Sequence, residues 1–225
     1  MKKTLLFALG LIAVGCAEGE QEESASCEDL TPESSLEDLR TCADQGDAFA
    51  QNVLGSRYIV GQGVPVDQVE AVRWYRLAAE QGDADAQTII GTMYGLGEDY
   101  VEAVRWYRLA AEQGNAGAQI NLGIMYAEGD GVPEDDVEAV RWWRLAAEQW
   151  SKDAQSNLGI AYARGQGVPQ DDVLAYMWLN LAAAQGSDGA QKLKDLIEQR
   201  MTREQIAEAQ RLSREWLEAH PPSGN

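Results

Sequence analysis

A repeated unit is the feature that most constrains what this chain can fold into. The dipeptide Ala-Gln recurs with spacings of 36, 32, 36 and 36 residues, at 50–51, 86–87, 118–119, 154–155 and 190–191. The segment Val-Glu-Ala-Val-Arg-Trp occurs at 69–74, 101–106 and 137–142, with an eroded copy at 173–178. A fixed period of this length is typical of an array of identical supersecondary units. The sequence therefore predicts four repeats, at 47–82, 83–114, 115–150 and 151–186.

Each repeat has the pattern of two helices. In the first helix, Ala50, Leu54 and Tyr58 share one face. Glycine costs a helix about 1 kcal/mol relative to alanine, so its recurrence at 55, 91, 123 and 159 predicts close approach of a neighbouring helix. The turn Gly-x-Gly-Val-Pro follows at 61–65, 129–133 and 165–169. The second helix begins at a capping signature, Asp-x-x-Glu, and stops at a glycine such as Gly82.

The charges and tryptophans of the second helix have structural explanations. Glu70 precedes Arg73 by three residues and Arg76 precedes Glu80 by four, so these charges are predicted to pair along an exposed face. Tryptophans recur in one register, at 74, 106, 142 and 178, which favours a core spine over a ligand-binding box. A helix pair buries its apolar face only by stacking on the next pair. The fold class predicted is all-α, a right-handed α-solenoid of helix-turn-helix repeats.

Residues 47–186 resemble the SEL-like ("Sel-one") repeat family, relatives of tetratricopeptide repeats. The matching motifs are Ala-x-x-x-Leu-Gly-x-x-Tyr, Gly-x-Gly-Val-Pro and Ala-x-x-Trp-Tyr-x-x-Ala-Ala-Glu-Gln-Gly. The resemblance implies a superhelix whose concave face is lined by the first helices. It also implies protein binding in the assembly of complexes, often at a bacterial envelope. Fold membership does not name the partner.

The N-terminus has the pattern of an export signal. Two lysines precede an apolar run at 5–14, which is too short to span a bilayer. Small residues followed by Cys16 resemble the lipobox of bacterial lipoproteins, which implies cleavage of residues 1–15 and acylation of Cys16; an ordinary signal peptide is the alternative. Ala17 is not the aspartate that retains lipoproteins at the inner membrane, which favours the periplasmic face of the outer membrane. Residues 16–27 are acidic and small, and are expected to form a tether.

The charge of the chain limits its partners. The formal net charge is −19, and removal of the two N-terminal lysines with the signal brings it to −21. Nucleic acids and anionic lipid head groups repel such a chain. We therefore expect a protein or peptide partner, no nucleic acid, and membrane contact only through the N-terminal lipid.

The ends of the array are predicted to be caps. Residues 28–46 form an N-terminal capping helix that Thr31-Pro32 opens, and residues 187–219 form C-terminal capping helices, before a loose tail at 220–225. Cys27 and Cys42 form either a disulfide, which export favours, or two free thiols.

Two positions break the repeat pattern. Repeat two lacks the Gly-Val-Pro turn, which indicates either a trimmed connection or a reshaped groove. Trp150 stands where other repeats have glycine, so it is either a packed wedge or an exposed contact residue.

Nothing in the sequence forms a catalytic constellation. The single histidine, His220, lies near the C-terminus, which removes histidine-based triads and zinc sites. No Ser-x-x-Lys and no phosphate-binding glycine-lysine motif occurs. The acidic clusters at 134–136 and 171–172 fall at helix N-termini, where the helix dipole favours negative charge. We expect no enzyme activity, cofactor or metal. The alternatives are β-lactam binding or hydrolysis, known among cysteine-rich members of the family, and binding of cell-wall or exported polysaccharide.

The partner-binding face is predicted on the outward edge of the first helices. This edge alternates amides, hydroxyls and aliphatic side chains, which suits an extended peptide or a helix. Its residues are Phe49, Asn52, Val53, Ser56, Thr88, Ile89, Thr92, Ile120, Asn121, Ile124, Ser156, Asn157 and Ile160. Repeats three and four pair an amide with an aliphatic residue at matching positions, Asn121 with Ile124 and Asn157 with Ile160, and are the favoured contact.

Overall fold

The computed structural model describes residues 26–221 and is helical throughout, with no strand among them. A short 3-10 helix, η1 (Cys27–Asp29), precedes eleven α-helices. These are α1 (Leu36–Asp44), α2 (Ala48–Val60), α3 (Gln68–Glu80), α4 (Ala84–Leu96), α5 (Tyr100–Glu112), α6 (Ala116–Glu128), α7 (Asp136–Glu148), α8 (Lys152–Arg164), α9 (Asp172–Ala184), α10 (Asp188–Glu198) and α11 (Arg203–Ala219).

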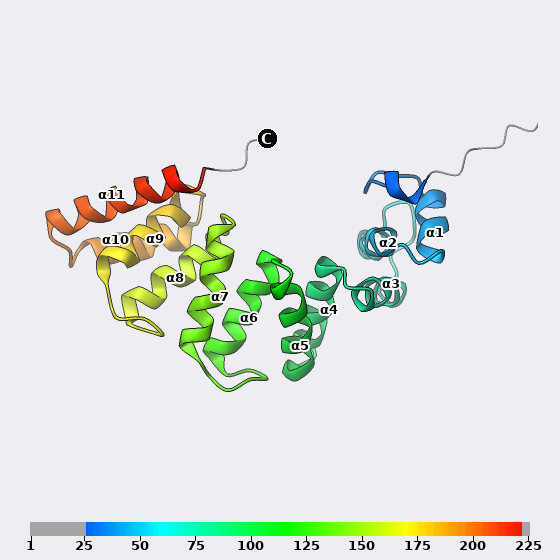
Figure 1. Ribbon diagram of the computed structural model, residues 1–225, viewed down its shortest axis with the longest axis horizontal. Helices are drawn as coiled ribbons and strands as arrows, with labels where there is room; N and C mark the ends of the chain where they lie inside the picture. The colour runs from blue at the N-terminus through cyan, green and yellow to red at the C-terminus, as the bar shows by residue number, and fades with distance from the viewer. Residues whose placement is uncertain (1–25, 222–225) are drawn as a thin grey trace, which may run out of the picture.

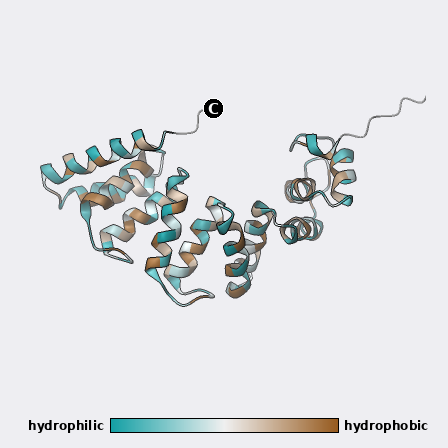
Figure 2. Ribbon diagram, in the orientation of Figure 1, coloured by the Kyte–Doolittle hydropathy of each residue, from teal (hydrophilic) through white to brown (hydrophobic). Residues whose placement is uncertain are grey.

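The helices stack in sequence order into an arc. Figure 1 shows α1 at one end and α11 at the other, with the open side of the arc between them. Each repeat is one antiparallel pair, α2–α3, α4–α5, α6–α7 and α8–α9, and each pair packs on the next. Most helices carry both hydrophobic and hydrophilic residues, as Figure 2 shows, because each buries one side. The predicted all-α solenoid is confirmed.

In each repeat, the second helix approaches the first helix at the recurring glycine of the first helix. A Cβ added to Gly55 or Gly91 would lie 2.8 Å from the ring of Tyr75 or Tyr107, respectively. At Gly123 it would overlap the Trp143 ring, and at Gly159 it would lie 2.5 Å from Leu179. The expectation of close helix approach is therefore confirmed.

A glutamine network explains the recurring Ala-Gln dipeptide. The buried Gln51 side chain donates to the carbonyl of Ala43, near the end of the capping helix α1, over 3.0 Å. Its oxygen accepts from Gln81 of its own repeat at 2.7 Å. The same two bonds recur at Gln87, Gln119 and Gln155. Each buried amide thus satisfies a carbonyl near the end of one second helix and ties it to the next layer.

Helix ends follow the predicted signals in most places. Gly61, Gly129 and Gly165 are left-handed C-caps of the first helices. Asp67, Asp135 and Asp171 accept backbone N–H groups as N-caps of α3, α7 and α9. The acidic clusters therefore serve as caps, as the sequence indicates.

Two local expectations are wrong. Helix α1 begins at Leu36 with Ser35 as its cap, not at Pro32, because the carbonyls of Pro32 and Ser34 turn to the buried guanidinium of Arg57. The predicted ion pair of Arg76 with Glu80 is not formed in the described chain, although Glu70–Arg73 is. At the equivalent of Arg76 in repeats two and three, the arginine donates instead to a tyrosine hydroxyl of the next repeat.

His220 is not part of a loose tail. Its ring stacks on Trp216 with the centroids 4.5 Å apart. Trp216 also meets Trp150 at 5.2 Å and Trp178 at 5.9 Å, both edge-on. Trp150 is therefore a packed residue, and it holds α11 against the array.

The cap at the other end is held covalently. Cys27 and Cys42 form a disulfide that joins η1 to α1, with 5.7 Å between their Cα atoms. Leu39 is fully buried beside them, and Leu36 packs against the same cluster.

Candidate functional site

The predicted binding face is only partly free. Phe49, Ser56 and Thr92 are exposed, whereas the remaining residues are half-buried: Asn52, Val53, Thr88, Ile89, Ile120, Asn121, Ile124, Ser156, Asn157 and Ile160. Several of these are already engaged within the array. Val53, Ile89, Ile120 and Ile124 pack against core clusters.

Two amides of the predicted face contact a neighbouring repeat, which the sequence pattern does not indicate. Asn52 donates to Asp83 of the next repeat at 2.9 Å. Asn121 lies beside the Tyr107 hydroxyl of the preceding repeat, and that hydroxyl donates to Thr92 at 3.1 Å. Both amides therefore lie where one repeat packs on the next, because the first helix of each repeat faces the neighbouring repeat.

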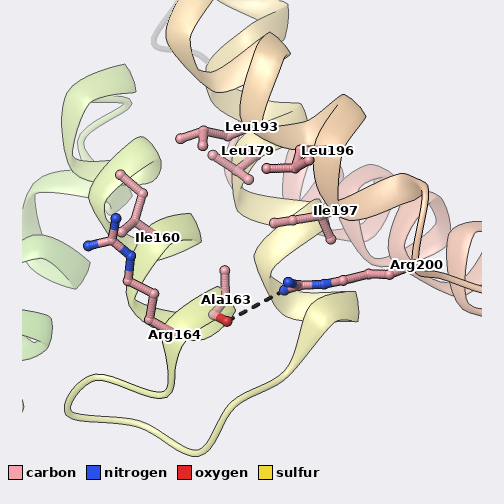
Figure 3. Close-up of a pocket in the computed structure, with 8 residues that line it drawn as sticks. All are labelled: Ile160, Ala163, Arg164, Leu179, Leu193, Leu196, Ile197 and Arg200. Carbon is pink, nitrogen blue, oxygen red and sulfur yellow. Dashed lines mark hydrogen bonds between the residues drawn. The ribbon is translucent and has the colours of Figure 1, made fainter.

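Ile160 and Asn157 lie where the face is hollowed. A pocket of about 210 Å³ opens between α8, α9 and α10, lined by Ile160, Ala163, Arg164, Leu179, Leu193, Leu196, Ile197 and Arg200. We call it the α8–α10 pocket. Figure 3 shows Ile160 facing Leu179, Leu193 and Leu196 across the opening. Apart from the two arginines, every lining side chain is aliphatic.

The pocket arises from one exchange in the repeat. Tyr75, Tyr107 and Trp143 fill the space over the first-helix glycine in repeats one to three. Repeat four has Leu179 at that position, which is smaller. One repeat earlier, the equivalent hollow is lined by Trp143, Asn157 and Ile160 and measures about 60 Å³. The loss of the aromatic ring therefore opens the larger pocket.

Two arginines frame the opening. The Arg200 guanidinium pairs with Asp172 and also donates to the carbonyl of Ala163 at 3.5 Å; Figure 3 draws the second bond. This contact joins α8 to the turn after α10, so it fixes the width of the pocket. Arg164 is exposed and extends beside Ile160.

The aliphatic lining of the pocket is suited to an apolar group. Residues 26–221 hold no group of three His, Cys, Asp or Glu side chains that could bind a metal ion. Burial raises the pKa of the Tyr107 hydroxyl, which donates a hydrogen bond to Thr92. Burial also raises the pKa of the Asp83 carboxyl, which caps α4. Both perturbed groups belong to the packing of the array.

Two further expectations concern the membrane. Cys16 lies outside the described residues. Among the helices of residues 26–221, none combines the length and apolarity that crossing a bilayer requires.

The sequence prediction missed the residues that make the pocket. Leu179, Leu193 and Leu196 were outside the predicted face, although Ile160 was in it. The available signal was the exchange of an aromatic residue for Leu179 within an otherwise regular position.

Comparisons with known proteins agree with this architecture. The family model of the Sel1 repeat matches residues 48–83, 84–115, 116–149 and 152–187. A protective antigen present in uropathogenic Escherichia coli strains, which displays an SLR fold, superimposes with a TM-score of 0.77 at 36% identity. That match covers 83% of this chain but only 41% of the antigen. A Sel1 repeat protein from Oxalobacter formigenes gives a TM-score of 0.68 at 36% identity, over 82% of this chain and 76% of that protein. No curated protein matches the sequence. With four matched repeats and this fold, the chain belongs to the Sel1 repeat family.

Proposed function

We propose that this protein is a lipid-anchored scaffold of the bacterial cell envelope that binds a partner protein through the α8–α10 pocket. Sel1 repeats are generally protein–protein interaction modules. The observation that carries the proposal is the aliphatic hollow of about 210 Å³ on the first-helix side of repeat four.

The pocket suits one apolar side chain of a partner. Protein interfaces draw most of their binding energy from a few anchor residues that fill well-packed, desolvated pockets, each contributing about 2 kcal/mol or more. Leu196, 60% exposed, is an aliphatic rim that a partner could cover. Asn157 lines the adjoining smaller hollow and offers a hydrogen bond beside it. Asn157 and Ile160, the amide and aliphatic pair predicted in repeat four, both line this region, which supports the proposal.

The anchoring part of the proposal depends on Cys16. The apolar N-terminal run, the small residues before Cys16 and the acidic segment after it support export, acylation and a tether. The periplasmic face of the outer membrane is the proposed location. Substitution Cys16→Ser is expected to move the protein from the membrane fraction to the soluble periplasmic fraction. Unchanged membrane association of that variant would contradict the anchoring proposal.

The binding part is tested by filling the pocket. A photo-crosslinking amino acid at position 196 is expected to capture a partner in intact envelopes, identified by mass spectrometry. A second variant adds Leu179→Trp to the protein that carries the photo-crosslinker. Repeat three has a tryptophan, Trp143, at the equivalent position, so we expect the fold to accept the ring and the ring to fill the pocket. We expect crosslinking to fall at least tenfold, and Asn157→Ala to weaken it in the same direction.

The matched control is Arg73→Ala, because this arginine is exposed and belongs to repeat one, away from the pocket. Its i,i+3 ion pair with Glu70 contributes little to stability, and its guanidinium lies 4.0 Å from the centre of the Trp74 ring. This variant is expected to leave crosslinking unchanged. If Leu179→Trp crosslinks as strongly as the parent protein, the pocket is not the binding site.

A further inference from the structure

A second surface lies on the opposite helices of the repeats. We propose that two grooves on α5 and α7 each bind an amphipathic helix of a partner protein, one that carries a carboxylate at the centre of its bound face. The α8–α10 pocket shares no residue with these grooves, so the two surfaces can be occupied independently.

The two grooves are equivalent positions in successive repeats. The first, of about 410 Å³, is lined by Val101, Val104, Arg105, Arg108, Leu109, Glu112, Gly131 and Val132. The second, of about 460 Å³, is lined by Val137, Val140, Arg141, Arg144, Leu145, Glu148, Gly167 and Val168. We call them the second-helix grooves. Two apolar side chains of each groove are exposed: Val101 is 66% and Val137 64% accessible, and Leu109 and Leu145 are 40% and 37% accessible. Val104 and Val140 are buried beneath them.

The wall of each groove is the Gly-Val segment of the next repeat's turn. Gly131 presses against the backbone of Tyr100 and Val101, and Gly167 presses against that of Asp136 and Val137. Any side chain at these glycines would overlap the first turn of the second helix. Repeat two lacks the Gly-Val-Pro turn, so α3 has the same exposed Val69 and Leu77 but no such wall.

The protein itself shows what covers this face. In repeat four, α11 packs on α9, where Asn180 donates to Ser213 at 3.3 Å. Asn180 is the equivalent of Arg108 and Arg144, which line the two grooves. Leu181, the equivalent of Leu109 and Leu145, is only 2% exposed in the repeat that α11 covers. The face of α9 that is equivalent to the two grooves is therefore covered by an amphipathic helix of the same molecule.

The residues at the rim of this face differ between α9, which α11 covers permanently, and the uncovered helices α5 and α7. In α9, the positions of Glu138, Arg141 and Glu148 hold Leu174, Met177 and Ala184. An obligate interface is more hydrophobic than a transient one, whose rim stays polar. The charged rims of α5 and α7 therefore fit a partner that binds and leaves.

Charge complementarity gives the partner's chemistry. Arg108 and Arg144 donate to the Tyr126 and Tyr162 hydroxyls at 2.8 and 2.7 Å, which hold each guanidinium at the groove. Glu112 and Glu148 line the same grooves, but neither arginine forms an ion pair within the part of the chain that the structure describes. In α11 the residue opposite this position is Ser213. A carboxylate at that place in a partner helix would meet an arginine, and charge-assisted hydrogen bonds are about twice as strong as neutral ones.

The test uses a defined probe, a fluorescein-labelled peptide of residues 203–219 carrying Ser213→Asp, titrated against the whole protein by fluorescence anisotropy. We expect Leu109→Glu combined with Leu145→Glu to weaken binding at least tenfold. The peptide with the native serine is expected to bind several-fold more weakly, and Arg108→Ala with Arg144→Ala to abolish the difference between the two peptides. Circular dichroism checks that each variant remains helical.

Three controls make the outcome decisive. Val69→Glu with Leu77→Glu, on α3 where the wall is missing, is expected to change binding less than twofold, and so is Leu179→Trp in the α8–α10 pocket. A peptide of the same composition in scrambled order is expected not to bind. Binding that survives Leu109→Glu with Leu145→Glu would mean that the peptide replaces α11 on α9, and the proposal would be wrong. A dimer that those same substitutions dissociate, seen by light scattering, would also overturn it, because the occupant would then be a second copy.

Discussion

Single residues decide how closely the helices of a repeat can pack. Gly123 is the clearest case, because the Trp143 ring packs directly against this glycine. The indole nitrogen of Trp143 also donates to the carbonyl of Ile120 at 3.3 Å. Helix propensity alone would favour alanine here. The close contact prevails over propensity, since the ring has no room to move within a packed layer.

Gly123→Ala is therefore expected to destabilise the protein. Overpacking costs about 1–3 kcal/mol, against a propensity gain of about 1 kcal/mol, so we expect a lower melting temperature by calorimetry. Gly189→Ala is the matched control, since a Cβ at that helical glycine meets nothing within 4 Å. It is expected to raise the melting temperature, and a decrease in both variants would contradict the close-packing explanation.

Trp150 combines a strained backbone with a useful side chain. Its φ is +66°, where the equivalent Gly82, Gly114 and Gly186 also have positive φ. Trp150→Ala loses the ring contact with Trp216 and keeps the left-handed backbone, whereas Trp150→Gly loses the ring and relieves the strain. We expect the glycine variant to be the more stable of the two by about 0.5–1 kcal/mol. Equal chemical denaturation midpoints would show that the strain is negligible.

Residue patterns predicted much of the fold and less of the site. The helix pairs, the caps and the glycine contacts could be predicted from local spacing, because the same residue pattern recurs in every repeat. The Asn52–Asp83 hydrogen bond and the placement of Asn121 beside Tyr107 depend on how one repeat packs on the next, and the pattern of residues on one helical face does not contain that information. The same holds for the pocket at Leu179, whose size depends on three helices meeting.

At the scale of elements, the two caps differ in how they are held. Helix α11 is docked by side chains, through Trp216, Ala209 and Ser213. The η1 segment and α1 are held by the Cys27–Cys42 disulfide and by Leu39 packing. The docking of α11 explains why the second-helix motif is altered in repeat four. Because α11 covers α9, this helix needs no charged residues at its rim.

The disulfide is expected to matter for the N-terminal cap only. Alkylation of the denatured, unreduced protein is expected to label neither Cys27 nor Cys42. Closing a loop of 15 residues contributes about 3 kcal/mol in the chain-entropy model. After reduction, hydrogen exchange is expected to speed up in α1 and to stay unchanged in α6 to α9. Labelling of both cysteines before reduction would show that the bridge is absent from the protein in solution.

Docking of α11 is tested by Trp216→Ala. This ring contacts Trp150, Trp178 and His220, and truncation of a packed tryptophan costs about 3–5 kcal/mol. We expect faster hydrogen exchange in α11 and cleavage of this helix by trypsin at its arginines. Leu217→Ala, on the same helix but 39% exposed, is the control and is expected to change neither. Equal protection of α11 in both variants would contradict the role assigned to the tryptophan cluster.

At the scale of the whole molecule, the arc is a one-dimensional stack. Contacts run between neighbouring helix pairs, and the core is divided into clusters that each join adjacent repeats. Stability in such an array is approximately a sum of repeat terms and nearest-neighbour interface terms. The position of a destabilising substitution along the stack therefore determines how many neighbouring helices lose protection.

Two equivalent leucines test this consequence. Leu54 in repeat one and Leu122 in repeat three are both fully buried, so each Leu→Ala substitution removes the same group at a cost of about 2–5 kcal/mol. Leu54 contacts the N-terminal cluster, whereas Leu122 belongs to the cluster that joins α5, α6 and α7. Under native conditions, Leu54→Ala is expected to accelerate hydrogen exchange in α1 to α3 and leave α8 to α11 protected. Leu122→Ala is expected to accelerate exchange in the helices on both sides of it, because a central repeat supports two interfaces. If both variants lose protection evenly along the chain, the protein unfolds as one cooperative unit and the nearest-neighbour description does not hold for it.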